Sequence, residues 1–287
     1  MALAVVGVTA MNQNGFPGPA DPTEAGSDFA KSVRRELETT KDTALMRAAA
    51  GELMARGSMA QSMARNKTGQ NPPVDALGLA ESLLKRVQEL DPGKPESSAG
   101  LARIYELRGM SATSEADKKA LAAARYRELG KTAGDLRADD PANASQLLTL
   151  ARSGLDAGDL DGAQKIANSL LMLVPRLKAD PRFSSSVDEI LHHSHLILGR
   201  IALRKGNIEV AKANLLDAGR VGGGGTLSSF GPNMALAKEL LEKHEKETVL
   251  QYFELCRKFW KFSNRMDPWI EAIRNDQIPN FGANLNY

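Results

Sequence analysis

The 287-residue sequence contains one cysteine, Cys256, and few aromatic residues, at 5% of the chain. A single cysteine excludes an intramolecular disulfide framework and a cluster of thiolate metal ligands. No apolar run approaches the roughly 20 residues that a membrane-spanning helix requires, so we expect no membrane span. Alternating β-branched runs, which are typical of strands, are missing as well. These absences favour an all-helical chain.

The charge balance also excludes a class of partner. Lys and Arg total 37 against 35 for Asp and Glu, which gives a net charge of +2. This charge cannot supply the broad positive field that non-specific nucleic-acid binding needs. We therefore expect no specific nucleic-acid partner.

The first residues leave the compartment open. Residues 1–10 resemble the apolar end of a secretory signal, with small Val8 and Ala10 near a cleavage position, but a positively charged segment does not precede them. The chain is either cytoplasmic with an ordinary N-terminus, or exported to the periplasm from a start that lies upstream. Residues 12–27 are rich in Gly, Pro and Asn, so we predict a flexible leader over residues 1–27.

Two segments repeat one spacing around a glycine. The glycine is Gly158 in the first copy and Gly206 in the second. Apolar or small residues lie eight and seven positions before it and five, nine and twelve after it: Leu150, Ala151, Ala163, Ala167 and Leu170, then Leu198, Gly199, Ala211, Leu215 and Ala218. Glycine allows a left-handed turn after the first helix, and small residues let the second helix approach closely.

Weaker copies extend the pattern in both directions. His244 replaces the turn glycine of a third copy, and Gly109 and Gly57 occupy that position upstream. We expect prolines such as Pro175 to end the second helices. The supporting apolar positions are, around His244, Leu236, Ala237, Val249, Phe253 and Cys256; around Gly109, Leu101, Ala102, Tyr105, Leu129, Ala133 and Leu136; and around Gly57, Ala49, Ala50, Leu53, Ala80, Leu84 and Val87.

This spacing of small residues, turn glycine and proline resembles tetratricopeptide (TPR) repeats over residues 44–262. The resemblance implies an all-α, right-handed superhelical array of about five helical hairpins with a C-terminal capping helix. We expect the repeat domain over residues 28–270 and a tail, 271–287, that packs on the cap. The sequence departs from the family at Leu147 and His195, where an aromatic residue is usual, and residues 176–186 lengthen one repeat. A generic helical bundle is the alternative.

In proteins of the TPR type the first helices line a concave face that holds ligands. The residue after the small packing position is basic in four copies: Arg103, Arg152, Arg200 and Lys238. One interpretation is a basic ladder that binds carboxylates or phosphates of a partner. The other is a set of solvated positions that neighbouring acids compensate.

Three further motifs have structural and chemical interpretations. A metal site at His192 and His195 lacks a third strong ligand, so we expect His195 in a packing position and His192 and His193 in solvent. The glycine-rich run 221–231 lacks the context of a phosphate-binding loop, so we expect a pliant inter-repeat loop. The C-terminal aromatic and basic residues either cap the array or contact a partner: Tyr252, Phe253, Phe259, Trp260, Phe262 and Trp269, with Arg257, Lys258, Lys261 and Arg265.

The sequence contains no nucleophile motif, so we expect neither an enzyme nor a cofactor. The leading hypothesis is a scaffold of bacterial style that binds a protein or peptide partner, including one with acidic groups. The alternatives are a structural component of the cell envelope that self-associates, and a metal-binding protein. Oligomeric state is left open.

Overall fold

A computed structural model describes residues 40–66, 75–134 and 136–285, with the side chains of residues 60–66 left aside. The predicted leader and the signal-like residues 1–10 lie outside this part. Every regular element in the described residues is a helix, and none is a strand. The all-α prediction is therefore confirmed. Within the same residues, no helix is long and apolar enough to cross a membrane.

The chain divides into two compact units between Thr132 and Ala133. The first unit contains four described helices, which follow one another along the chain: α3 (Thr43–Asn66), α4 (Ala76–Leu90), α5 (Pro95–Ser111) and α6 (Glu115–Thr132). Its core consists of the apolar faces of these helices, among them Leu53, Leu84 and Leu101.

The second unit begins with the 3₁₀ turn η1 (Pro141–Asn143). Two long helix pairs follow, and shorter helices complete the unit: α7 (Ala144–Ala157), α8 (Leu160–Ala179), η2 (Ser184–Ser186), α9 (Val187–Arg204), α10 (Ile208–Gly219), α11 (Gly225–Phe230), α12 (Ala235–Leu241), α13 (Lys246–Cys256), η3 (Ser263–Met266), α14 (Asp267–Arg274) and η4 (Gly282–Leu285).

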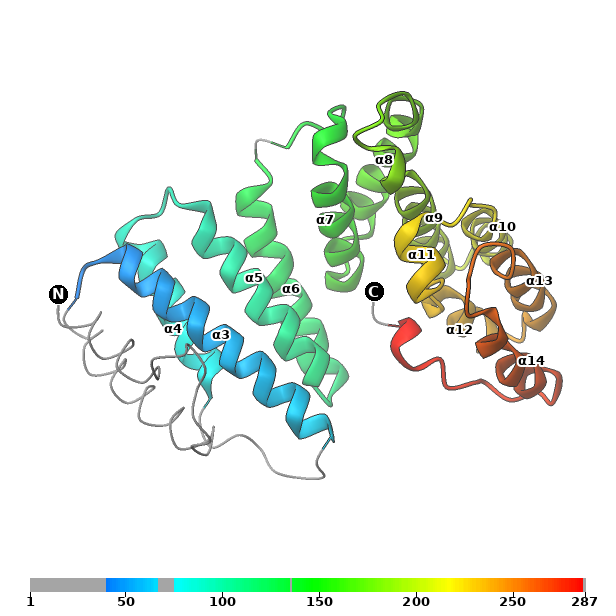
Figure 1. Cartoon of the computed structure of the whole chain (residues 1–287), viewed down its shortest axis with the longest axis horizontal. Coiled ribbons are helices and arrows are strands. Elements are labelled where there is room, and N and C mark those ends of the chain that lie inside the picture. Colours follow the sequence, from blue (N-terminus) through cyan, green and yellow to red (C-terminus); the bar gives the residue numbers. More distant parts are fainter. Residues whose placement is uncertain (1–39, 67–74, 135, 286–287) are drawn as a thin grey trace, which may run out of the picture. The chain divides into compact units, whose positions relative to one another are not determined.

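Successive helices of the described residues pack as pairs. The pairs are α3 with α4 and α5 with α6 in the first unit, and α7 with α8, α9 with α10 and α12 with α13 in the second. Within each unit the pairs also contact one another, through α4 with α5, α8 with α9, and α10 with α13. Figure 1 shows these helices in order along the chain.

The buried residues of the second unit confirm the predicted spacing. Most of the small and apolar positions named from the sequence are fully buried: Ala151, Ala163, Ala167, Leu170, Ala211, Leu215, Ala218, Ala237, Val249, Phe253 and Cys256 are each 0% exposed. Leu150 and Leu198 are only half-buried. Gly199 shows why one position must be small. A Cβ there would lie 2.3 Å from Leu236 Cδ2, so even alanine would force the Leu236 side chain of α12 to move.

The three turns of the second unit share one geometry. Gly158, Gly206 and His244 have φ angles of 91°, 81° and 64°, all in the left-handed region. In each turn the next backbone N–H donates to a carbonyl five residues earlier: Asp159 to Gly154 at 2.9 Å, Asn207 to Ala202 at 2.8 Å and Glu245 to Leu240 at 3.0 Å. These are the bonds of a Schellman C-cap. The predicted left-handed turn is confirmed, including the copy in which histidine replaces glycine.

Other predicted boundaries are wrong. Pro175 lies inside α8, which continues to Ala179. The helix continues because Val174 and Leu177, on either side of the proline, remain buried, and this packing outweighs the lost backbone hydrogen bond. In the first unit, Gly57 and Gly109 lie inside α3 and α5. Gly57 instead allows close packing, since a Cβ there would lie 2.8 Å from Leu77 Cδ2.

Part of the glycine-rich run is helical, so the expected loop over all of residues 221–231 is wrong. Residues 225–230 form α11. The Asp188 carboxylate on α9 accepts the backbone N–H groups of Gly222 and Gly224 at 3.1 and 3.0 Å. Leu227 is buried in the core. These contacts fix the run against α9.

The C-terminal residues pack on the last helix pair. Phe281 is 1% exposed, and its ring meets those of Phe253 and Trp269 with centroids 6.3 and 5.0 Å apart. The Asn284 carbonyl accepts the backbone N–H of Met234 at 2.8 Å. Most aromatic rings of this end are therefore inside the second unit.

The turn geometry predicts opposite effects for two substitutions. Gly206→Ala places a Cβ in the left-handed region and should lower the free energy of unfolding by about 1 kcal/mol. His244→Gly removes a Cβ from the same left-handed conformation at an exposed site. It should therefore raise the free energy of unfolding by a similar amount. Urea unfolding followed by tryptophan fluorescence reports on this unit, because both tryptophans lie in it. Equal signs for the two variants would contradict the shared turn.

Candidate partner-binding surface

The four basic positions lie on first helices of their pairs. Arg103 is on α5 in the first unit. Arg152, Arg200 and Lys238 are on α7, α9 and α12 in the second. The structure thus places three of them on successive first helices of one unit.

Arg200 contacts acids on the first helices of the preceding and following helix pairs. Its Nε and Nη2 atoms donate to Glu239 Oε1 on α12 at 2.9 and 2.7 Å. Its Nη1 atom lies 3.7 Å from Asp156 Oδ1 on α7. The side chains of Arg200 and Glu239 are only 22% and 27% exposed. Arg200 therefore links three first helices.

Two of the other basic side chains also have acidic neighbours. Arg103 pairs with Glu106 one turn later on α5, and Glu106 also accepts from Arg125 at 2.9 Å. Lys238 pairs loosely with Glu242 at 3.4 Å, and both side chains are more than 40% exposed. Among these rungs, Lys238 and Arg103 offer the most accessible charge.

Arg152 on α7 is half-buried. It lies close enough to His192 and His193 to influence both imidazoles electrostatically.

The sequence interpretation missed the acids that complete this arrangement. Asp156 lies four residues after Arg152, and Glu239 directly follows Lys238. An acidic residue within four positions of Arg152 and of Lys238 was the available indication. Only the packing of α7, α9 and α12 shows that both acids meet Arg200, because these residues are far apart in the sequence.

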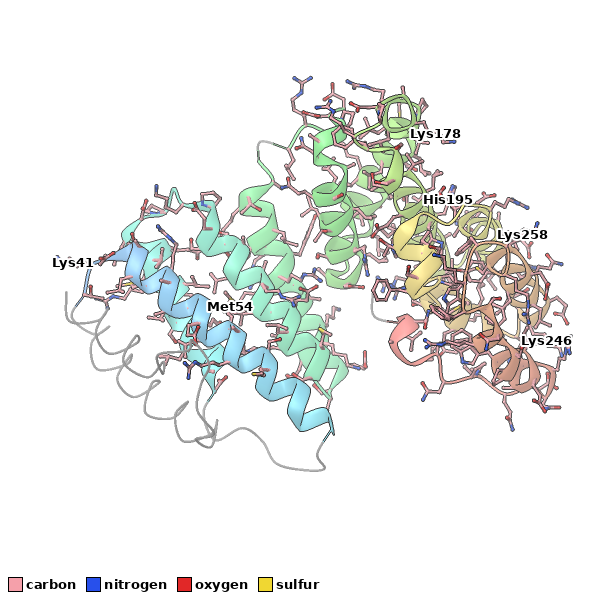
Figure 2. The ribbon with its side chains drawn as sticks, viewed as in Figure 1. Lys41, Met54, Lys178, His195, Lys246 and Lys258 are labelled. Carbon is pink, nitrogen blue, oxygen red and sulfur yellow. The ribbon has the colours of Figure 1, made fainter. Side chains whose placement is uncertain are left out.

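The histidines are inside the second unit, so the prediction that His192 and His193 lie in solvent is wrong. They are 0% and 4% exposed. His192 Nδ1 donates to the Ala218 carbonyl at 2.8 Å, and Nε2 accepts the Asn233 N–H at 3.1 Å. A backbone N–H can only donate, so the ring is neutral and carries its proton on Nδ1. His195, labelled in Figure 2, contacts Asn214 Oδ1 at 3.1 Å.

These bonds decide what the histidines can do. Burial lowers the pKa of His192 to about 4, although the Ala218 carbonyl favours the charged form. Burial also lowers the pKa of His193. Both nitrogens of His192 are committed to the backbone, and in the described residues no group of three potential ligands is placed to hold a metal ion. His192 fixes the segment before α12 to the end of α10.

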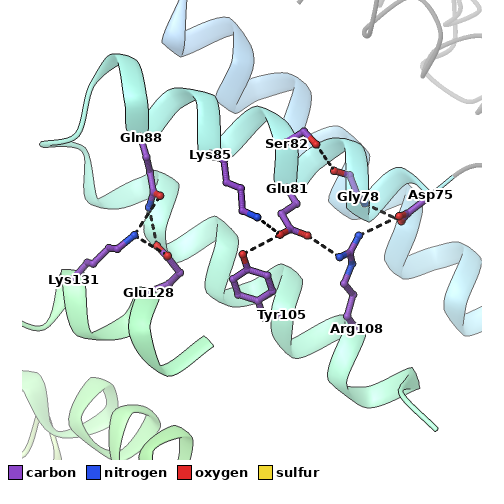
Figure 3. A network of polar contacts seen from close by, with 10 residues as sticks. All are labelled: Asp75, Gly78, Glu81, Ser82, Lys85, Gln88, Tyr105, Arg108, Glu128 and Lys131. Atoms are coloured by element: carbon purple, nitrogen blue, oxygen red, sulfur yellow. Dashed lines mark hydrogen bonds and ion pairs between the residues drawn. The ribbon is translucent and has the colours of Figure 1, made fainter. Parts of the chain in front are cut away.

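A polar network joins the helices of the first unit (Figure 3). Glu81 on α4 accepts hydrogen bonds from Tyr105 Oη at 3.0 Å and Arg108 Nη1 at 2.7 Å on α5, and pairs with Lys85 at 2.7 Å. Burial alone would raise the pKa of Glu81, but the bonds from Lys85 and Tyr105 and the charge of Arg108 lower it. The carboxylate therefore stays ionised between α4 and α5.

The same network continues towards α6. Gln88 Nε2 donates to Ser98 Oγ at 2.8 Å and to Glu128 Oε2 at 2.7 Å, and Lys131 Nζ pairs with Glu128 Oε1 at 2.7 Å. The sequence interpretation did not select these residues, since none of them repeats in register. Their contacts fix α4, α5 and α6 to one another and present no catalytic pair.

Comparison with known proteins identified no relative. A scan against protein-family models, a search of curated proteins and a search of solved structures each returned no match.

A double-mutant cycle tests the link between α9 and α12. Arg200→Ala and Glu239→Ala should show a coupling free energy of about 1–2 kcal/mol, because both groups are largely shielded from water. The matched control is Lys205 with Asp161, which pair at 2.9 Å but are 39% and 92% exposed. That pair should couple by less than about 0.5 kcal/mol. Equal coupling in the two cycles would contradict the structural role of Arg200.

Protonation of His192 should make stability depend on pH. The unfolded histidine takes up its proton near pH 6.5 and the folded one near pH 4. Stability is therefore complete above about pH 6.5 and falls as the pH drops towards 4, by about 3 kcal/mol for this group. Urea unfolding at pH 7, 6 and 5 should show a shallower dependence of stability on pH in His192→Gln than in the native chain. Identical slopes in the two proteins would rule out a buried neutral His192.

Proposed function

We propose that this chain is a protein-interaction scaffold of TPR-like architecture. The finer arrangement, a right-handed superhelical array, is part of this proposal. The observation that supports it most directly is the register of the second unit, where the same small residues and left-handed turns recur in three helix pairs. Stacked pairs of this kind present an extended surface that suits a peptide or protein partner.

The described residues supply no rival chemistry that would favour an enzyme. The thiol of Cys256 is fully buried, and its pKa is raised by burial well above the ordinary value. This thiol is therefore protonated at neutral pH and is a poor nucleophile. The conspicuous histidines and the glycine-rich run contribute to packing instead.

Arg103, Arg152, Arg200 and Lys238 are the side chains that we propose for partner binding. Carboxylates of the partner suit them, since guanidinium groups bind carboxylates through two parallel hydrogen bonds and lysine through its charge. Arg200 would have to exchange Glu239 for the partner, so its contribution is smaller than that of Lys238 or Arg103. The ladder is thus a set of unequal rungs.

Two variants test this proposal when they are used as bait to capture partners from a lysate of the cells that express this protein. Arg103→Ala/Arg152→Ala/Lys238→Ala removes three rungs. Arg200→Ala/Glu239→Ala removes the internal pair together, so that Glu239 is not left without Arg200. The triple variant should bind the partner with roughly fivefold lower affinity, which corresponds to a loss of about 1 kcal/mol of binding free energy. The partner is one whose binding to the native chain is saturable. The double variant should have a smaller effect.

The control Lys165→Ala/Lys178→Ala/Lys243→Ala removes the same charge from exposed positions of the second unit. Circular dichroism verifies that each variant keeps its helices. Unchanged recovery by the triple variant would eliminate the ladder. Absence of any saturable partner for the native chain would eliminate the scaffold function.

A further inference from the structure

One end of the second unit exposes aromatic rings that its core does not use. Phe259 and Trp260 are 8% and 2% exposed, whereas Phe262 and Phe230 are 49% and 68% exposed. The capping interpretation therefore accounts for the first two rings but leaves Phe262 and Phe230 at the surface. Exposed rings of this size are typical of contact sites.

The two exposed rings belong to segments that are held together. The backbone N–H of Lys261 donates to the Ser228 carbonyl at 3.1 Å. Gly231, next to Phe230, packs so closely on the indole of Trp260 that a Cβ would lie 2.4 Å from it. The C-terminal end of α11 and the segment after α13 therefore form one surface.

Positive charge surrounds Phe262. Lys258, Lys261 and Arg265 are exposed, and none of the three has an ion pair among the residues that the structure describes. The nearby acids Glu254 and Asp267 both pair with Arg257, at 3.5 and 2.5 Å. Arg265 lies over the Phe262 ring, 5.4 Å from its centroid. The stacked guanidinium keeps its edges accessible for an anion.

A shallow groove adjoins this surface. It has a volume of about 270 Å³, lies between α10 and α13, and is lined by Leu216 and Leu255 together with the polar residues Arg220, Gln251, Glu254 and Lys258. Lys258, labelled in Figure 2, therefore belongs both to the groove and to the basic surface. Arg220 pairs with Asp217, and Glu254 pairs with Arg257. The groove therefore offers apolar contact beside Lys258, the lining cation that no described acid pairs with.

We propose that Lys258, Lys261, Phe262 and Arg265, together with this groove, form a docking surface for an acidic peptide segment of a partner protein. The carboxylates pair with the three cations, and an apolar side chain of the peptide enters the groove beside Leu216 and Leu255. This inference rests on the proposed scaffold function but names a different surface from the basic ladder. Charge complementarity selects the occupant, because an acidic segment neutralises cations that no described acid pairs with.

A peptide fits these observations better than a nucleic acid or a membrane. Three cations on a chain of net charge +2 provide a small share of the phosphate contacts that a nucleic-acid site uses. A membrane surface requires a continuous apolar helix face, whereas here the apolar positions form a groove and isolated rings. A short peptide matches both the size of the groove and the number of charges.

Selection of random 12-residue peptides displayed on phage against the full chain tests the proposal. The enriched peptides should contain at least two Asp or Glu residues and one large apolar residue. Binding of an enriched peptide, measured by fluorescence anisotropy, should weaken at least tenfold in Lys258→Glu/Lys261→Glu/Arg265→Glu. The matched control Lys165→Glu/Lys178→Glu/Lys243→Glu makes the same change in net charge elsewhere on the unit and should bind normally.

Each outcome decides between the surface and its rivals. Enriched peptides without net negative charge, or equal weakening in the two triple variants, would overturn the docking surface while leaving the scaffold function in place. Failure to enrich any peptide would overturn the docking surface, whereas the scaffold function is decided separately by the affinity capture of partners. Binding of the chain to phosphatidylserine vesicles or to single-stranded DNA in place of peptides, lost in the same variant, would assign the surface to a membrane or a nucleic acid. A doubled mass in light scattering, lost in that variant, would assign it to a second copy.

Discussion

Close approach of paired helices is the constraint on which the second unit depends. Two helices can pack tightly only where small side chains face each other and the connecting turn reverses the chain at once. Ala151, Gly199 and Ala237 meet the first condition, and Gly158, Gly206 and His244 meet the second. The larger apolar residues then fill the space between the pairs. The helix order therefore follows from a few small side chains.

Charge has two uses in this protein. Inside each unit, ion pairs join neighbouring helices. In the first unit Glu81 on α4 pairs with Arg108 on α5, and in the second Arg200 joins α7, α9 and α12. At the C-terminal end, by contrast, Lys258, Lys261 and Arg265 are uncompensated by the described acids. Paired charges stabilise the framework, whereas unpaired exposed charges remain available for a partner.

Residues that suggest chemistry in the sequence become part of the packing. His192 bonds the backbone of Ala218 and Asn233 with its two ring nitrogens, and the glycine-rich run is held by Asp188. Burial keeps the Cys256 thiol protonated. Each motif has ligand-like residues, but its partners are other parts of the same chain. Residue type alone could not reveal this, because the partners lie 26 to 41 residues away.

The sequence by itself determined the helical class and, in the second unit, the buried small residues and the left-handed turns, because these depend on spacing within one or two turns of helix. His244 was assigned to its turn from that spacing alone. Tertiary structure decided the rest. It kept Pro175 inside α8, enclosed His192 and His193, and brought Asp156 and Glu239 to Arg200. Those outcomes depend on contacts between distant segments, and local periodicity carries no information about which distant side chains will meet.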